Sequence, residues 1–295
     1  MRLGVDFGGT KIEAALLDSG GEIRARLRAA NPGSYEAAIA ATRELAARIE
    51  AETGVAARTI GVGMPGSLSP ADGLVRNANS VWLNGRPFLE DLKAAFGRPV
   101  RVENDANCFA LSEAVDGAAA GAGVVFGAIL GTGCGGGVVV GGKVIGGANA
   151  IGGEWGHLPL PWPRADEMPP RDWCGRHNCL EQWISGTGLK RWSGMDGAAL
   201  DAGVRAGEAK AHAVLDLLAD RLARALAMII DIVDPDVVVL GGGLSNIDAL
   251  YASVRGKLIA HVFSDVVRTK LVKNLHGDSS GVRGAAWLFS AEEAG

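Results

Sequence analysis

Glycine turns between short apolar strands most strongly restrict the folds open to this sequence. Leu3 to Phe7 and Ile12 to Leu17 are apolar runs on either side of Gly8-Gly9, which is typical of a β-hairpin. Val124 to Leu130 and Gly137 to Val140 flank a second glycine turn in the same way. Glycine accounts for 44 of the 295 residues, well above the usual share of ~7%, and it gathers where strands end and the backbone must come close to something.

Strands and helices alternate over the rest of the chain. Three further buried strands are predicted, at Ile60 to Met64, Val100 to Glu103 and Val237 to Leu240. Apolar residues at helical spacing predict helices over residues 34–54, 106–119 and 213–233, and behind Ser279. The second half repeats the order of the first, so we expect an internally duplicated α/β protein of about two domains.

The charge balance excludes several classes of partner. The chain has 29 basic and 33 acidic side chains, a net charge of -4, which gives no preference for nucleic acid or for a membrane surface. The apolar run Ala225 to Ile230 stops at Asp231, far short of the ~20 residues that cross a bilayer. We find no secretory signal and only four cysteines, too few for a disulfide framework, so we expect a cytoplasmic protein.

Two familiar phosphate-binding motifs fail the test of their surroundings. Residues 131–136 match the dinucleotide fingerprint, but Val138 to Val140 predict a strand where that motif requires a helix. Residues 4–11 resemble a P-loop, but they end in Gly9-Thr10-Lys11 where a P-loop has Gly-Lys-Thr, and a strand again follows. Neither of these two folds is therefore expected.

The two hairpins together fit a nucleotide better than either does alone. Each has a threonine after a glycine, Thr10 and Thr132, so two turns facing each other across a cleft can hold phosphates through N–H groups and hydroxyls. Asp6 then lies beside the phosphates, where a carboxylate can hold a hydrated Mg²⁺. Gly241-Gly242-Gly243 ends another strand ahead of a predicted helix. A tight turn without a ligand is the alternative for either hairpin taken singly.

These segments carry a family resemblance. The phosphate 1, phosphate 2 and adenosine motifs of the actin-like, hexokinase-type ATPases resemble Asp6 to Lys11, Gly131 to Gly133 and Gly241 to Gly243. The ROK family of bacterial sugar kinases resembles the chain from end to end, most clearly in Glu103 to Asn107, Gly153 to His157 and Cys174 to Glu181. Within that family, the fructokinase branch is most similar in Asn77 to Gly85 and His276 to Gly284.

The resemblance implies a fold and a set of ligands. The fold is α/β, with two actin-like (ribonuclease H-like) domains, residues 1–106 with 281–295 and residues 107–280, around a central nucleotide and sugar cleft. ATP and Mg²⁺ are the implied cofactors, with nucleotide contacts from Asp6, Gly8, Gly9, Thr10, Lys11, Gly131, Thr132, Gly133, Gly241, Gly242 and Gly243. The expected enzyme is a homodimeric kinase that phosphorylates fructose at the 6-hydroxyl, with mannose and glucose as further acceptors.

Other functions remain as alternatives. N-acetylglucosamine kinase and glucokinase belong to the same family. A sugar-responsive repressor is more remote, because such proteins carry an additional N-terminal helix-turn-helix domain and the phosphate turn here begins by residue 6. A non-catalytic sugar-binding protein would bind a hexose without consuming ATP.

Asp105 is the candidate catalytic residue. A sugar hydroxyl must lose its proton as it attacks the γ-phosphate, so a carboxylate has to lie beside it. Asp105 follows a predicted strand between Asn104 and Asn107, whose amides can bind hydroxyls, although it could instead only cap the next helix. The resemblance implies sugar contacts from Gly66, Ser67, Asn79, Asn104, Asp105, Glu154, His157 and Glu181. Without it, the last three would equally be two solvated acids and a structural histidine.

A cysteine segment adds a candidate zinc site. ROK proteins carry Cys-x-Cys-Gly-x-x-Gly-Cys and a preceding histidine, a four-ligand structural site. In this chain Asp172 takes the position of the first cysteine of that motif. Because zinc also accepts a carboxylate oxygen, the ligands that the resemblance implies are His157, Asp172, Cys174 and Cys179. His177 is a rival ligand, and two reduced cysteines packed without metal are the alternative. Cys108 and Cys134 have no ligand neighbours and are expected to be small buried residues.

Overall fold

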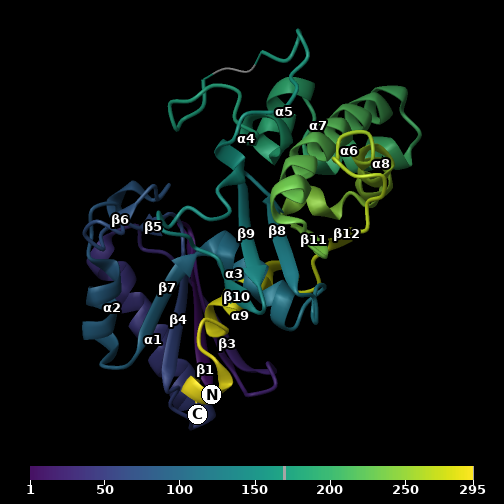
Figure 1. Ribbon diagram of the computed structural model, residues 1–295. Coiled ribbons are helices and arrows are strands. Elements are labelled where there is room, and N and C mark those ends of the chain that lie inside the picture. Colours follow the sequence, from purple (N-terminus) through teal and green to yellow (C-terminus); the bar gives the residue numbers. More distant parts are fainter. Residues whose placement is uncertain (169–170, 295) are drawn as a thin grey trace.

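Two five-stranded sheets form the framework of the computed structural model, which describes residues 1–168 and 171–294 (Figure 1). The first sheet runs in the order β3 (Ile23–Ala30), β2 (Lys11–Leu17), β1 (Arg2–Phe7), β4 (Thr59–Met64) and β7 (Val100–Asn104). The second runs in the order β10 (Lys143–Val144), β9 (Cys134–Val140), β8 (Val124–Leu130), β11 (Val237–Gly241) and β12 (Lys270–Lys273). Parallel strands continue an antiparallel hairpin in each sheet, so both glycine hairpins and the internal duplication are confirmed.

Helices divide the molecule into two lobes. In the first lobe, α1 (Tyr35–Thr53) and α2 (Phe88–Phe96) pack on the first sheet, and in the second lobe α7 (Ala209–Val233) and α8 (Asp248–Leu258) cover the second sheet. Shorter helices are α4 (Glu181–Ile184), α5 (Gly186–Ser193), α6 (Gly197–Arg205) and α10 (Ala291–Ala294). A small hairpin pairs β5 (Ser67–Leu68) with β6 (Val75–Arg76).

The boundaries of several predicted helices change. The helix predicted over 34–54 is α1, which Gly54 ends in the left-handed conformation at a φ of 66°. The helix predicted over 106–119 is α3 (Asp105–Val115), which ends four residues early. After β11 the chain first forms a 3-10 helix, η3 (Gly243–Asn246), so the predicted helix begins only at Asp248.

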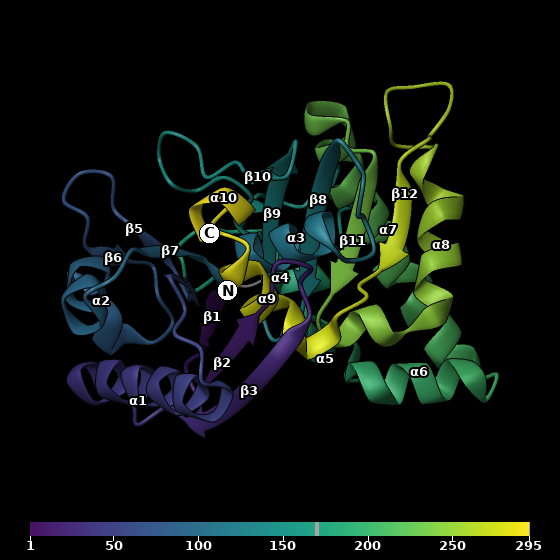
Figure 2. The ribbon, with the colours of Figure 1, turned by 90° about the horizontal axis from the view of Figure 1, so that it is seen from below.

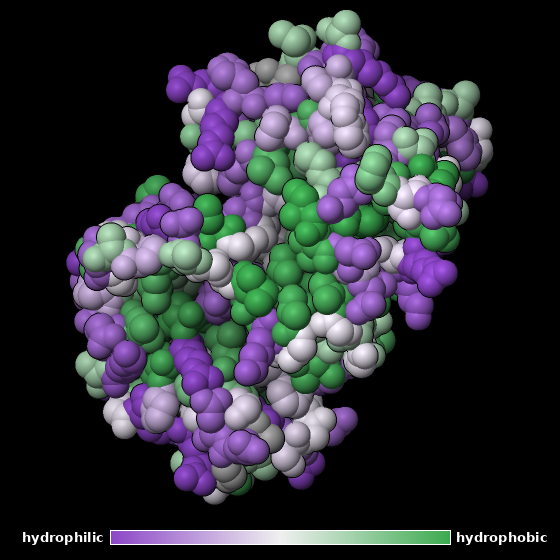
Figure 3. All heavy atoms as spheres, in the orientation of Figure 1, coloured by the Kyte–Doolittle hydropathy of each residue, from purple (hydrophilic) through white to green (hydrophobic). Residues whose placement is uncertain are grey.

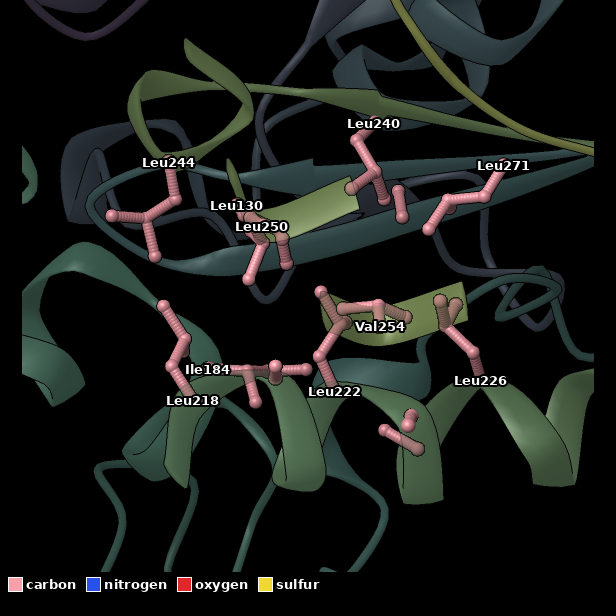
Figure 4. Close-up of a cluster of buried hydrophobic side chains, with 14 of the residues drawn as sticks. Leu130, Ile184, Leu218, Leu222, Leu226, Leu240, Leu244, Leu250, Val254 and Leu271 are labelled. Carbon is pink, nitrogen blue, oxygen red and sulfur yellow. The ribbon is translucent and has the colours of Figure 1, made fainter. Parts of the chain in front are cut away.

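The largest hydrophobic core lies between α7 and the second sheet. Leu218, Leu222 and Leu226 recur every four residues, so they share one face of α7 and point toward the strands (Figure 4). Leu240 of β11 and Val254 of α8 meet them from the other side (Figure 4). Burial of each such side chain contributes about 1.5–3 kcal/mol, which makes this lobe a firm support for the cavities at its edge.

Helices α3 and α9 (Ser280–Ala286) pack against each other between the two sheets (Figure 2). Glycine permits this contact, because a Cβ at Gly284 would lie 1.7 Å from the Cys108 carbonyl oxygen and one at Gly61 would lie 1.7 Å from that of Ala285. α9 thereby returns the C-terminal part of the chain to the first sheet, and the two termini lie near each other (Figure 1). The division into residues 1–106 with 281–295 and residues 107–280 stays a proposal.

The surface is hollowed between the two lobes (Figure 3). Within residues 1–168 and 171–294, no helix has the length and apolar character needed to cross a membrane.

Candidate active site

Strand β7 delivers Asp105 to the first position of α3. Asn104 ends the strand, and its Oδ1 accepts a hydrogen bond from the Ala106 N–H at 2.9 Å while its Nδ2 donates to the Gly66 carbonyl oxygen at 2.9 Å. Asn104, and not Asp105, is therefore the residue that caps α3. Asp105 Oδ1 also accepts from the Ala106 N–H, at 2.8 Å, and its side chain is exposed in the wall of a cavity.

The surroundings of Asp105 suit a base. Protein encloses the carboxyl on most sides, although its outer face is open to the cleft. This desolvation, together with the negative charges of Asp6 and Glu154, disfavours the ionised form and raises the pKa of Asp105 from 3.8 to about 6. A general base works best when its pKa lies near the working pH, because it is then deprotonated and still able to bind a proton.

Asp6 and Asp105 line the same cavity, of about 330 Å³. They stand at the carboxyl ends of β1 and β7, which run parallel to β4 between them, so one edge of the first sheet supplies both. The opposite walls come from Gly242 and Gly243 behind β11 and from the start of α9. At Gly281 of that helix a Cβ would lie 3.3 Å from Asp6 Cγ, so the helix closes on the carboxylate. Two carboxylates beside exposed glycine backbone suit a phosphate group with a hydrated cation.

A larger cavity of about 780 Å³ adjoins the first, with Gly243 and Asn246 in the walls of both. Gly131 and Thr132 of the β8–β9 turn line it, opposite α5 and α6. Gly242 has a φ of +77°, and a Cβ there would lie 2.5 Å from the Leu130 carbonyl carbon, so only glycine fits this turn. Because the two cavities share these wall residues, together they can hold a nucleoside and its phosphates.

The β1–β2 turn lies outside both of these cavities. Gly8, Gly9, Thr10 and Lys11 line neither, and Gly9 and Thr10 are exposed. A Cβ at Gly9 would lie 2.9 Å from Ser80 Oγ, which places the turn beside the segment after β6. The nucleotide role expected for this turn is therefore a prediction that neither cavity supports directly.

Glycines of β9 bring the segment that carries Glu154 close to the start of α3. On one face of the strand, a Cβ at Gly135 would lie 3.0 Å from Ala106 Cβ, and on the other face one at Gly136 would lie 2.8 Å from the Gly153 carbonyl oxygen. The strand is thus held between the start of α3 and the segment from Gly153 onward, which continues into the 3-10 helix η2 (Trp155–His157). Glu154 is exposed and close enough to Asp105 to affect its pKa.

Glu181 is fixed on both of its oxygens. Oε2 accepts a hydrogen bond from the Cys134 N–H at 3.0 Å, and Oε1 accepts one from Trp173 Nε1 at 2.8 Å. A Cβ at Gly133 would lie 2.6 Å from Oε2, so the β8–β9 turn rests directly on this carboxylate. Glu181 is therefore an anchored group and not a solvated loop acid.

The remaining predicted sugar contacts lie in the first lobe. Gly66 has a φ of +77°, and a Cβ there would lie 2.4 Å from the Arg76 carbonyl oxygen. Ser67 is buried, and its Oγ accepts a hydrogen bond from Arg76 Nε at 3.4 Å. Asn79 is exposed on the segment that follows β6. Asn107 is buried and donates to Glu103 Oε1 at 3.0 Å, so its amide is directed to the protein and not to a sugar.

The four expected metal ligands come together. One ligand atom from each of His157, Asp172, Cys174 and Cys179 lies within 4.8 Å of all the others. His157 Nδ1 is 3.2 Å from Asp172 Oδ2, and the two sulphurs are 3.6 Å apart. His177 is exposed and stands outside the cluster, so it is Asp172 and not His177 that lies with the other three residues. Burial raises the pKa of Cys134 and of Cys108 well above the usual value, in keeping with their expected role as buried, inert thiols.

One important residue was missed from the sequence. Glu113 of α3 is completely buried, and its carboxylate accepts hydrogen bonds from the backbone N–H groups of Ala118, Leu275 and His276 and from Ser280 Oγ, at 2.8–3.2 Å. It thereby ties the helix that starts with Asp105 to the segment that walls the smaller cavity. No local pattern marks it, since its partners lie more than 160 residues further along the chain, apart from Ala118.

The fold and the site together define a class of protein. Two lobes with duplicated sheets, and nucleotide-sized cavities at the carboxyl ends of their strands, are the arrangement of the actin-like ATPases. The family model "ROK family" matches residues 2–292, and the chain therefore belongs to the ROK family.

Individual relatives are similar over nearly their whole length. The N-acetyl-D-glucosamine kinase of Vibrio cholerae serotype O1 is 41% identical over 300 residues, covering 98% of this chain and 99% of the relative. The solved structure of a ROK hexokinase from Thermus thermophilus is 34% identical, with a TM-score of 0.85 and 97% of each chain covered. That of a ROK family glucokinase from Streptomyces griseus, in complex with glucose and AMPPNP, is 26% identical, with a TM-score of 0.78 and 97% of each chain covered.

Proposed function

We propose that this protein is an ATP-dependent N-acetylglucosamine kinase that transfers the γ-phosphate of ATP to the 6-hydroxyl of the sugar. The coarser conclusion, a sugar kinase of the ROK family, follows from family membership together with the site. The observation that carries the proposal is the position of Asp105, which lines the same cavity as Asp6 and whose pKa of about 6 fits a base. The 41% identity to an N-acetylglucosamine kinase supports the choice of sugar.

The expected fructokinase activity is not supported by the comparisons. The relative with 41% identity acts, by its name, on N-acetylglucosamine, and the two solved relatives are a hexokinase and a glucokinase. The resemblance to fructokinases rested on residues 77–85, which contain the 3-10 helix η1 (Val81–Leu83), and on residues 276–284, which contain η4 (Gly277–Ser279) and most of α9. Such segments do not by themselves determine which hydroxyls or acetamido groups face the sugar.

The proposed mechanism uses residues of both lobes. Asp105 accepts the proton of the attacking hydroxyl at its exposed oxygen, while Glu154, His157 and Glu181 orient the sugar. Asp6, beside the smaller cavity, would hold hydrated Mg²⁺, which neutralises charge on the phosphates when bound. The larger cavity would take the nucleoside, and closure of the cleft would exclude the water that otherwise hydrolyses ATP.

The cluster of His157, Asp172, Cys174 and Cys179 fits zinc. Its nitrogen, oxygen and sulphur donors are those that zinc prefers, and four protein ligands leave no open position, so the metal would be structural. Zinc would hold the loop that carries Trp173 and the start of α4.

Removal of the metal should raise the KM for the sugar more than the KM for ATP, and metal analysis should find about one equivalent of zinc per chain. Less than about half an equivalent in protein purified without chelator would count against the site.

A substrate panel tests the main proposal. ADP release is measured with N-acetylglucosamine, glucose, mannose and fructose, and we expect the highest kcat/KM for N-acetylglucosamine. A preference for another of the four sugars would overturn the choice of sugar and leave the kinase class intact. The proposal also includes a cytoplasmic homodimer, which light scattering of the purified protein would test.

A further inference from the structure

Trp173 is an exposed aromatic residue within the loop of the metal cluster. It stands between Asp172 and Cys174, and its side chain is 65% exposed. Its ring meets the His157 ring edge-on, with centroids 5.1 Å apart. An indole this exposed makes little use of the hydrophobic effect, so its position calls for another explanation.

The indole N–H of Trp173 supplies that explanation. Nε1 donates to Glu181 Oε1 at 2.8 Å, and the Cys134 N–H donates to Oε2 at 3.0 Å, so one protein donor fixes each oxygen of the carboxylate. An ionised carboxylate has about four acceptor positions, which leaves about two for sugar hydroxyls. Without the indole, Glu181 can pivot about its bond to Cys134, and the free acceptor positions lose their direction.

The donor and the acceptor of this hydrogen bond are both tied to the metal cluster. The Trp173 N–H donates to Asp172 Oδ1 at 2.9 Å, and Glu181 follows Cys179 by two residues at the start of α4. Fixing the four cluster residues therefore fixes the distance between the indole and the carboxylate.

We infer that Trp173 is a positioning residue for sugar binding, in which the indole N–H holds the Glu181 carboxylate in the orientation that accepts sugar hydroxyls. This inference rests on the proposed function, in which Glu181 contacts the sugar. Trp173 makes no proton transfer and touches no phosphate, so its effect falls on binding of the sugar and not on the chemical step.

Trp173→Phe is the direct test, because phenylalanine keeps a ring against His157 and removes only the N–H donor. With metal-loaded enzyme, sugar binding is measured by calorimetry and turnover by ADP release. We expect the sugar Kd and KM to rise about tenfold, the loss typical of one hydrogen bond to a charged group, while kcat and the KM for ATP stay within twofold. A sugar Kd within twofold of the wild-type value, or a loss of zinc in the variant, would overturn the inference.

A double-mutant cycle shows whether Trp173 acts through Glu181. In a Glu181→Gln background, the penalty of Trp173→Phe should fall to less than threefold, because a neutral amide accepts a weaker hydrogen bond. An undiminished tenfold penalty would mean that the ring acts by packing, against the inference.

Trp162→Phe is the matched control. Trp162 is 57% exposed and stacks on His261, so its loss should leave the sugar Kd within twofold, and an equal loss there would contradict a specific role for Trp173. The cycle is run with N-acetylglucosamine and with whichever tested hexose has the highest kcat/KM. If another hexose is preferred but the Trp173→Phe penalty still depends on Glu181, only the choice of sugar is overturned. If N-acetylglucosamine is phosphorylated but the penalty does not depend on Glu181, only the role of Trp173 is overturned.

Discussion

The two glycine hairpins have the same strand–turn–strand arrangement but differ in the contacts that hold their turns. In the β8–β9 turn, the Gly186 N–H donates to the Gly131 carbonyl oxygen at 2.7 Å, the Glu181 carboxylate holds the next strand, and the turn lines the larger cavity. In the β1–β2 turn, Asn31 bonds to the carbonyl oxygens of Gly8 and Thr10, and the tip stays exposed. A duplicated sheet can thus carry a formed pocket in one copy and an open turn in the other.

The largest expected effect is the loss of kcat on substitution of Asp105, a residue that lies in neither hairpin. Asp105→Asn keeps the shape of the side chain and removes the base, so kcat should fall about 10³-fold while ATP binding is retained. Steady-state kinetics and nucleotide titration measure the two quantities. Glu90→Gln on α2 removes an exposed carboxylate and should leave kcat unchanged. A kcat within tenfold of wild type in Asp105→Asn would remove the base from the mechanism.

The pH profile sharpens the same point. Because Asp105 must be deprotonated to act and its pKa is about 6, kcat/KM should drop about tenfold per pH unit below pH 6. A raised carboxyl pKa also means that its favourable contribution to stability is present below 3.8 and is lost as the pH rises through about 6. Asp105→Asn should therefore melt at or above the wild-type temperature at pH 8. An activity limb centred near pH 4 would contradict the assignment.

A pair of alanine substitutions tests the difference between the turns directly. Gly242→Ala meets the Leu130 backbone at 2.5 Å from a φ of +77°, so the KM for ATP should rise about tenfold and stability should fall by about 1–3 kcal/mol. Gly9→Ala meets only Ser80 Oγ, which can rotate away, so the KM for ATP should change less than threefold. Equal effects in kinetic and melting measurements would show that the open turn is as constrained as the formed pocket.

The last expected effect is on stability and concerns Glu113, which joins α3 to residues 275–280. Glu113→Gln leaves buried N–H donors facing an amide NH₂ group, so the free energy of unfolding should fall by about 2 kcal/mol. Urea unfolding measures it, with Glu44→Gln on the exposed face of α1 as the control. Equal stability of the two variants would mean that Glu113 does not hold residues 275–280 in place.

Elements with a periodic apolar pattern could be predicted from the sequence, whereas β12 and α5, which depend on pairing and packing with other elements, could not. β1, β2, α1 and α7 have strong local patterns, and their apolar faces enter the cores as expected. β12 was missed because Lys270–Lys273 is four residues long with a charge at each end, and pairing with β11 decides its conformation. α5 was missed because Gly186 and Gly188 lower its helix propensity, which the Ser185 cap and packing offset.

The site divides in the same way. Asp6 and Asp105 were marked by polar residues where predicted strands end, and the cluster ligands by the resemblance to the cysteine segment of ROK proteins. Glu113 and Trp173 escaped notice, because their roles depend on hydrogen bonds that only the folded chain creates. The comparisons do not support the predicted sugar for a related reason, since the choice of sugar depends on where loop groups stand in space.

The return of α9 to the first sheet makes the first lobe depend on two segments that are far apart in the sequence. Val282 and Ala286 of α9 fill a small core with Ala15 and Leu17 of β2. The strands of the second sheet, in contrast, all lie between β8 and β12, ahead of α9. A variant without α9 should therefore still form the second sheet, while Ala15 and Leu17 lose their cover and the smaller cavity loses the wall that Ser280 and Gly281 supply.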